Sequence, residues 1–481
     1  MTRRAPGSRV RAALGWLAIA LLVFTCYFGL ATRFSYEPWP TTSGGFVFNS
    51  QLRALLDGRL DIAPQAAGNE GFVRDGKTYT YFGLWPALLR LPVATQLWRD
   101  WTTASCVLAA TLAALALLRA ATAMPQAAST PLMRAIPLVL AASFVLSGPQ
   151  VELLGRPSVY VEAVLWAYAG ACVFLCTALP LLFGQSVTAR RLTLLAACAA
   201  VALLARVSTG LALYAAAAAL ACALAWRWHA EGFAWRARLR CLLPAAVVLL
   251  SAVLVTVAVN TQRWGRPLEF APLALNRYYA ADPVRLARLA QHGAFALARV
   301  PDALSYYAAP AWFFAAPAGS ARAARVEELF DGPEGPPIGV PQAQGLWLAL
   351  AAFGAWALTR RRAGLAFTPG ARALALGRAH GPLRVARQPY LAFRYRAEFA
   401  PSILLFALIG LHALRARLAR SSTPLQVLVF AVALAACAAQ ILQAHAALRA
   451  YTCTPMGSYQ AARAAASSCL SRPWAKSFTA D

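Results

Sequence analysis

Charged side chains are scarce in this sequence of 481 residues, at 13%, whereas hydrophobic side chains make up 60%. The mean hydropathy is +0.54. Soluble globular domains have about 25% charged residues, and they cannot hide so large an apolar fraction from water. The composition therefore excludes a soluble globular protein and indicates a chain that lies in a lipid bilayer.

Motifs for nucleotide or zinc binding are also missing. The sequence contains no Walker motif and no glycine-rich phosphate loop. Its five histidines are scattered, and no cysteine or histidine spacing matches a zinc site. We therefore predict that no metal site is present and that no cofactor is required, although the sequence leaves a divalent metal ion open.

Acidic residues are few, 18 against 45 basic ones, which gives a net charge of +27. The basic residues do not form the single patch that nucleic-acid binding requires. They flank the apolar runs in short connections, as at Arg190, Arg236 and Arg415, which is the pattern of cytoplasmic loops. Most carboxylates lie in two long loops, about 32–100 and 260–342. We predict a bacterial inner-membrane protein with a cytoplasmic N-terminus, extracytoplasmic long loops and no nucleic-acid partner.

Apolar runs of roughly 16 to 24 residues recur along the chain, and a helix needs about 20 to cross the hydrocarbon core. The pattern predicts a single transmembrane domain over residues 1–481, an all-α polytopic protein with about 10–11 transmembrane helices. The clear runs are 12–31, 102–122, 134–149, 160–183, 190–205, 209–226, 241–259, 343–359, 399–414 and 423–443.

One crossing is missing from this pattern. The runs ending at Leu358 and Leu414 both lead into arginine-rich, cytoplasmic-type connections, so another crossing must lie between them. The available stretch, 363–388, contains prolines, glycines and arginines unlike a lipid-facing helix. Three interpretations stay open: a helix shielded inside the bundle, an inverted topology, or a local shift of the reading frame.

The first long loop, 32–100, is organised. Residues 46–56 predict a short amphipathic helix at the membrane surface. Asp75 and Gly76 predict a turn before Tyr79 and Tyr81, and the apolar stretch after Gly83, interrupted by prolines, predicts a half-buried interfacial helix. A loop of this length is usually functional.

The second long loop, 260–342, is rich in aromatic residues, which either stack on sugars or line the membrane interface. Its stretch 331–337 predicts an exposed flexible turn. The tail, 444–481, is expected to be periplasmic, where Cys453 and Cys469 would be free to pair; two free thiols is an equally good interpretation.

Five segments, taken in order, resemble bacterial GT-C glycosyltransferases related to glycosyltransferase family 39, which includes protein mannosyltransferases and the lipid A aminoarabinose transferase. The resemblance implies a GT-C-like fold and a sugar carried on polyprenyl phosphate. It also implies transfer on the outer face to a lipid, glycan or protein acceptor. The segments are LLDGRLDI (55–62), RDGKTYTYFGLWPALLRLP (74–92), ARVSTG (205–210), NTQRWGRPLEF (260–270) and FRYRAEFAP (393–401).

A polyprenyl-phosphate donor needs cations near the membrane surface to hold its phosphate. Arg206, at the outer end of a pair of apolar helices, and Arg394 and Arg396, before another helix, have forked guanidiniums suited to this task. Tyr395 and the tyrosines of the first loop, Tyr79 and Tyr81, complete the predicted donor site. The alternatives are interfacial anchoring and, for Arg206, a structural pair with Glu152 or Glu162.

The catalytic carboxylate that the resemblance implies lies soon after the first transmembrane helix. The candidates are Glu37, Asp61 and Asp57, with Asp75 last because it belongs to a turn signal. The acid expected at the start of the surface helix is absent, because Asn49 is the nearest polar equivalent. Asp57 and Asp61 are also explained as a helix-end turn and a solvated loop residue.

Lipid-linked sugar transfer accounts best for the long loops, the embedded arginines and the ordered motifs. Its partners are a polyprenyl-phosphate-linked sugar, a lipid or glycan acceptor, and membrane lipids. A transporter or flippase is the alternative, and it predicts inverted repeats and charges near the bilayer midplane. A lipid-glycan ligase or polymerase is the third possibility, since it would share the outer loops.

Overall fold

Long apolar helices form most of the computed structural model, which describes residues 6–124, 130–317, 319–334, 338–360, 365–378 and 386–453. In this part of the chain, eight helical stretches are long and apolar enough to cross a membrane. They contain α1 (Pro6–Ala31), α5 (Thr102–Ala123), α6 with α7 (Pro131–Ser147, Pro149–Leu154), α8 (Val159–Leu182), α10 (Val207–Ala230), α11 (Trp235–Trp264), α21 (Arg396–Leu418) and α22 (Thr423–Cys453).

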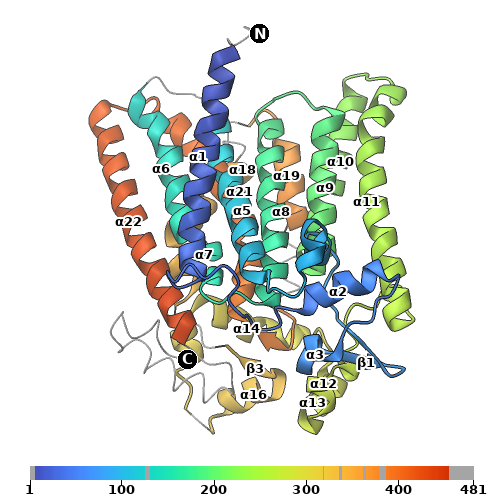
Figure 1. Cartoon of the computed structure of the whole chain (residues 1–481). Coiled ribbons are helices and arrows are strands. Elements are labelled where there is room, and N and C mark those ends of the chain that lie inside the picture. The colour runs from blue at the N-terminus through green and yellow to red at the C-terminus, as the bar shows by residue number, and fades with distance from the viewer. Residues whose placement is uncertain are drawn as a thin grey trace.

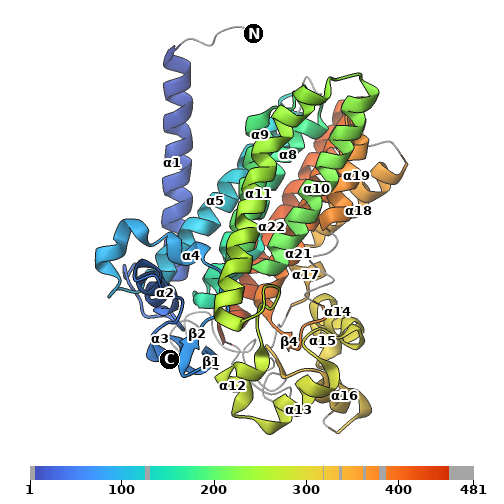
Figure 2. The ribbon, with the colours of Figure 1, turned by 90° about the vertical axis from the view of Figure 1, so that its right-hand side faces the viewer.

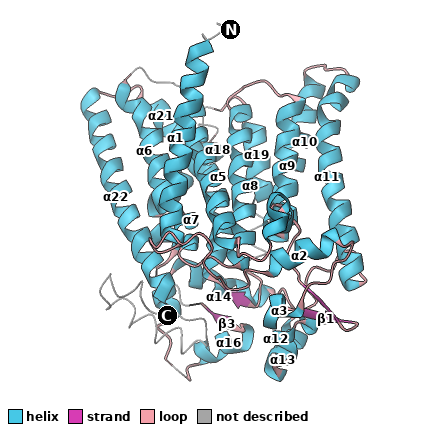
Figure 3. Ribbon diagram, viewed as in Figure 1, coloured by secondary structure: helices cyan, strands magenta, loops and turns pink. Residues whose placement is uncertain are grey.

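Three shorter helices complete the bundle, and Figures 1 and 3 show them among the long ones. They are α9 (Ala189–Ala205), α18 (Gly345–Thr359) and α19 (Thr368–Arg378). The prediction of an all-α polytopic membrane protein is thereby confirmed, whereas eight of the predicted 10–11 crossings are long and apolar enough in the described residues.

Short elements gather at one end of the bundle, which we call the loop end (Figure 1). Residues 32–100 supply the first group: α2 (Val47–Leu56), α3 (Pro64–Ala67), the 3-10 turns η1 (Gly68–Glu70) and η2 (Leu91–Gln96), strands β1 (Phe72–Arg74) and β2 (Lys77–Tyr79), and α4 (Trp85–Leu88). The two strands form an antiparallel hairpin that pairs Arg74 with Lys77, so the turn predicted at Asp75 and Gly76 is confirmed.

The rest of the loop end comes from residues 265–317, 319–334, 338–344 and 386–395. Its elements are η3 (Leu273–Leu275), α12 (Arg277–Ala280), α13 (Pro283–His292), η4 (Leu297–Arg299), α14 (Val300–Ala308), α15 (Pro310–Phe313), α16 (Ala321–Leu329), β3 (Gly332–Pro333), α17 (Val340–Ala343), β4 (Tyr390–Leu391) and η5 (Phe393–Tyr395). They pack below the helices in Figure 2, where α12 lies next to the β1–β2 hairpin and α14 to α16 lie farther to the right.

One end of the bundle carries the long loops, and the opposite end carries short, arginine-rich connections (Figure 1). The first described residues of α1 and the connections between α8 and α9, α10 and α11, and α21 and α22 lie at the end opposite the loops (Figure 1). These connections carry the arginines that suggested cytoplasmic loops. Helix α22 ends at the loop end, the side on which the tail was predicted to lie.

The segment that lacked an obvious crossing contains α19, which packs against the bundle. Ala371 and Leu374 of this helix are fully buried, and a Cβ on Gly377 would collide with the backbone of Ala216 in α10. Its 11 residues span about half of the hydrocarbon core. Leu376 on the opposite face of α19 is 71% exposed, so only one face of the described helix is shielded by the bundle; residues 379–385 lie outside the described part.

The exposed flexible turn predicted at 331–337 is wrong in its described part. Asp331 and Glu334 are buried, and β3 pairs with β4 in a parallel register that joins Gly332 to Tyr390. Asp331 accepts hydrogen bonds from Tyr279 and Arg288. The glycines and prolines marked the segment correctly as non-helical, but its two carboxylates are buried by arginine and tyrosine partners far away in sequence. Residues 335–337 lie outside the described part.

Two glycines allow α18 and α21 to approach each other closely. A Cβ on Gly354 of α18 would overlap the carbonyl oxygen of Phe406 in α21, and a Cβ on Gly410 would overlap that of Leu350. In a membrane, where lipid is as apolar as the side chains, such close backbone approach is a main source of helix association.

Alanine at Gly354 or Gly410 forces α18 and α21 apart. We expect each substitution to cost about 1–3 kcal/mol, the usual range for overpacking, and to lower the thermal unfolding midpoint in detergent, followed by tryptophan fluorescence. Gly15 of α1, whose added Cβ would meet nothing within 4 Å, is the matched control. If Gly15→Ala lowers the midpoint as much as the other two do, the close contact does not determine stability.

Candidate functional site

Arg206 is the single residue between two antiparallel helices at the loop end. Helix α9 ends at Ala205 and α10 begins at Val207, and Arg206 adopts an extended conformation with φ −154 and ψ 115. The first long loop packs directly on this tip, because a Cβ on Gly83 would overlap the carbonyl oxygen of Leu204. The prediction that Arg206 lies at the outer end of two apolar helices matches this position.

Arg206 forms an ion pair with Glu398 in the first turn of α21. The guanidinium also lies over the ring of Tyr395, at 4.8 Å from its centroid. The Arg206 side chain is 12% exposed and that of Glu398 only 1%. The predicted structural pair of Arg206 with Glu152 or Glu162 is therefore wrong, since Arg206 takes a carboxylate 192 residues away.

Arg394 lies against the same group of aromatic rings. Its guanidinium is 4.5 Å from the ring centroid of Tyr160 and 5.3 Å from that of Tyr395. It pairs with Glu334 from the second loop, whose other oxygen accepts a 2.6 Å hydrogen bond from the backbone of Phe393. The second loop thus fixes this arginine.

Arg396 faces a different part of the bundle. It pairs with Glu152 of α7 at 3.4 Å and donates to the carbonyl oxygen of Ile338. Arg394 and Arg396 are two residues apart at the start of a helix, so their side chains leave in different directions. The structure therefore brings Arg206, Arg394 and Tyr395 together and ties Arg396 to a separate carboxylate.

Tyr81 completes what we call the arginine–tyrosine cluster, formed by Arg206, Arg394, Tyr395, Tyr160 and Tyr81. Burial raises the pKa of Tyr81 well above its usual value; the charges of Glu70 and Tyr395 raise it further, while Arg206 and Arg394 lower it. The phenol is therefore neutral and acts as a hydrogen-bonding group.

Tyr79 was predicted for the same site but packs elsewhere. Its ring contacts Trp264 at the end of α11, at a centroid distance of 5.9 Å.

Glu70 is the first-loop carboxylate that faces this cluster, and the sequence analysis did not select it. The charge of Glu70 acts on the phenols of Tyr81 and Tyr160. The Asn276 amide holds it from the second loop by donating to the Glu70 carbonyl oxygen at 3.1 Å. Only the fold brings η1 under the tyrosines, so no local sequence signal distinguishes Glu70 from the other loop acids.

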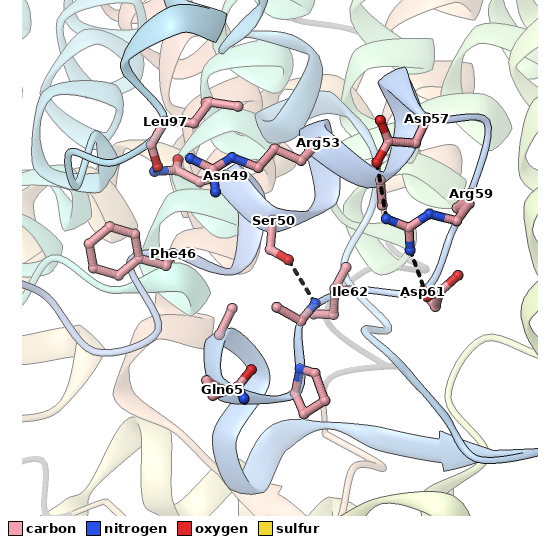
Figure 4. Close-up of a pocket in the computed structure, with 14 residues that line it drawn as sticks. Phe46, Asn49, Ser50, Arg53, Asp57, Arg59, Asp61, Ile62, Gln65 and Leu97 are labelled. Carbon is pink, nitrogen blue, oxygen red and sulfur yellow. Dashed lines mark hydrogen bonds and ion pairs between the residues drawn. The ribbon is translucent and has the colours of Figure 1, made fainter.

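The predicted catalytic carboxylates lie in other surroundings. Glu37 is exposed after α1. Asp57 and Asp61 pair with Arg59 at 3.0 and 2.8 Å on the wall of an open hollow of about 620 Å³ beside α2 (Figure 4). Within the described residues, Asp57 and Asp61 form their ion pairs with Arg59 and not with the arginine–tyrosine cluster, and the Glu37 backbone bonds to Ser35.

The hollow in Figure 4 is connected to the helices by a buried ion pair. Asn49 on its wall accepts a 2.7 Å hydrogen bond from Arg90, which pairs with Glu162 of α8 through two contacts of 2.7 and 2.9 Å. Arg90 and Glu162 are almost completely buried. This pair fixes the first loop on the helix that also carries Tyr160.

The predicted disulfide cannot be placed, because Cys469 and the side chain of Cys453 lie outside the described residues. In the described part of the chain, no three histidine, cysteine or acidic side chains come together in a group that would hold a metal ion.

Removing one partner of the Arg90–Glu162 pair leaves the other charge buried. We expect Glu162→Ala to cost about 3–5 kcal/mol of stability, as for other broken buried pairs, measured by unfolding in detergent. Glu231→Ala breaks the surface pair with Arg227, whose side chains are 40% and 42% exposed, and should change stability by less than about 1 kcal/mol. Equal losses would show that the buried pair does not fix the loop.

The fold is similar to that of an archaeal oligosaccharyltransferase. The apo crystal structure of the Archaeoglobus fulgidus oligosaccharyltransferase matches with a TM-score of 0.52 and 13% identity, over 90% of this chain and 56% of that one. The Archaeoglobus fulgidus enzyme AglB in complex with an inhibitory peptide and a dolichol-phosphate matches with a TM-score of 0.49 and 15% identity, over 90% and 55%.

No protein-family model and no curated protein sequence matches the chain. This chain spans about 56% of the length of the archaeal structure. The relation to glycosyltransferase family 39 stays a prediction, whereas the predicted GT-C-like fold agrees with the likeness to the archaeal structure.

Proposed function

We propose that this protein transfers a sugar from a polyprenyl-phosphate donor to a lipid, glycan or protein acceptor at the periplasmic face of a bacterial inner membrane. The observation that carries the proposal is the arginine–tyrosine cluster with Glu70 at the loop end. It supplies cations for a phosphate, rings for a sugar and a carboxylate for proton transfer. The GT-C-type fold supports the same reaction class.

The cations lie where a lipid phosphate would reach them. Arg206 stands at the tip of the α9–α10 hairpin, with part of its side chain exposed, and Arg394 lies over the same tyrosines. A polyprenyl tail would stay in the lipid while its phosphate meets the cluster at the end of the bundle. Forked guanidiniums bind phosphate by charge-assisted hydrogen bonds.

Glu70 is our proposal for the general base. It would take the proton of an acceptor hydroxyl as the acceptor oxygen bonds to the anomeric carbon of the sugar. The bond between that carbon and the phosphate oxygen breaks, and polyprenyl phosphate leaves with one more negative charge. Arg206 and Arg394 would stabilise that charge, because preorganised cations act on charge that develops in the transition state.

The orientation of the protein in the membrane is part of the same proposal. The loops 32–100 and 260–342 and the tail 444–481 would be periplasmic, with the N-terminus in the cytoplasm. This is supported by the arginine-rich connections at the opposite end of the bundle (Figure 1). A divalent metal ion is not required for the proposed step.

Purified protein in nanodiscs, offered radiolabelled polyprenyl-phosphate sugars and a membrane lipid extract, tests the proposal. We expect Glu70→Gln to lower kcat at least about 100-fold, the usual contribution of acid–base catalysis. Arg394→Gln should raise KM for the donor. Asp75→Asn, in the same loop with a side chain 81% exposed, is the matched control and should keep full activity.

The earlier candidates enter the same assay as Glu37→Gln, Asp57→Asn and Asp61→Asn. If one of these abolishes transfer while Glu70→Gln does not, the base lies outside the cluster and the assignment of Glu70 is wrong. If wild-type protein transfers no sugar from any donor but moves lipid-linked sugar across the membrane, a flippase replaces the proposed transferase.

A further inference from the structure

A buried arginine without a partner lies at the end of α19. Arg378 is 1% exposed, and none of its three guanidinium nitrogens has a hydrogen-bond partner in the described part of the chain. Helix α19 is held there by the contact of Gly377 with α10 and by Ser402 of α21, whose hydroxyl donates to the Arg378 carbonyl oxygen at 3.3 Å. An unpaired guanidinium in an apolar bundle is costly, so its presence calls for a reason.

Glu398 supplies the complementary observation. One of its carboxylate oxygens pairs with Arg206, while the other, Oε2, is buried and has no hydrogen-bond partner among the described residues. Glu398 precedes Ser402 by one helical turn, and its charge acts on the Arg378 guanidinium. Glu398 therefore has one unbonded carboxylate oxygen and lies one helical turn from Ser402, the residue of α21 that contacts the Arg378 backbone.

The unbonded oxygen of Glu398 matters for the proposed donor site. A phosphate that binds Arg206 brings negative charge next to Glu398, and two anions in a buried site repel each other. If Glu398 stayed in place, the repulsion would offset the attraction of Arg206 for the phosphate. A second guanidinium on the neighbouring helix α19 would remove the conflict, because Glu398 would then have a partner after leaving Arg206.

We propose that Arg378 is the alternative counter-ion of Glu398, which turns from Arg206 to Arg378 when an anionic phosphate headgroup binds Arg206. This inference rests on the proposed function, because it names a lipid phosphate as the ligand. Arg378 is then a positioning residue that acts through Glu398 and does not touch the donor. With the phosphate bound, Arg206 would be paired with the phosphate and Glu398 with Arg378.

A stability cycle without ligand tests the exchange. We expect Arg206→Gln to lower the thermal unfolding midpoint slightly, because Glu398 then turns to Arg378, and Arg378→Gln to leave it unchanged or raise it, because that variant loses an unpaired buried charge while Glu398 keeps Arg206. The double variant should lose more than the sum of the two, since Glu398 is then buried without a cation. The excess should vanish when both substitutions are made in a Glu398→Gln background. Additive losses in both backgrounds would overturn the proposal.

Binding of polyprenyl phosphate, with polyprenol of the same chain length as the uncharged probe, gives a second readout in nanodiscs. Arg378→Gln should weaken binding of the phosphate on the order of tenfold and leave polyprenol unchanged. Adding Glu398→Gln should restore it, because no carboxylate then needs a new partner. Arg378→Lys should bind between the two.

Weak binding that persists in Arg378→Gln with Glu398→Gln would show that Arg378 contacts the phosphate directly or is purely structural, and would overturn the exchange. Wild-type protein that binds the phosphate no better than the alcohol would remove the proposed donor instead. The stability cycle would still decide whether Glu398 has two alternative partners.

Discussion

A guanidinium inside an apolar bundle is costly unless it is paired or hydrogen-bonded, and this cost explains how the loops of this protein meet its helices. Arg90 joins the first loop to α8 through Glu162, Arg394 joins Glu334 of the second loop to the start of α21, and Arg206 joins the α9–α10 tip to Glu398. Each pair connects segments far apart in the sequence. The loop end is therefore fixed by buried charge.

The same pairs prepare a site for an anion. Arg206 and Arg394 are oriented by carboxylates and by tyrosine rings before any ligand arrives, so little reorganisation is needed when charge develops on a leaving phosphate. Their carboxylates also keep the unloaded site from carrying an uncompensated positive charge. The cost is competition between the phosphate and Glu398 for Arg206, which the unpartnered guanidinium of Arg378 would relieve.

Periodicity and composition were sufficient for the membrane class, the helix positions and the placement of Arg206, because these depend on local hydropathy. The carboxylates of the site were not predictable in the same way. Glu70, Glu334 and Glu398 lie in three separate segments and meet only through tertiary packing, so Glu334 was assigned to an exposed turn. Helix α19 was not predicted from hydropathy. Its Arg378 and its glycines are typical of a surface that packs on protein and not of one that faces lipid.

Photocrosslinking with a polyprenyl phosphate that carries a photoreactive group beside the phosphate tests the central claim most directly. The account predicts that the label falls on peptides at the α9–α10 tip, residues 205–208, and at the start of α21, residues 393–398, and that inorganic phosphate or Arg206→Gln reduces it. Labelling confined to the hollow beside α2, or equal labelling by the corresponding polyprenol, would contradict it.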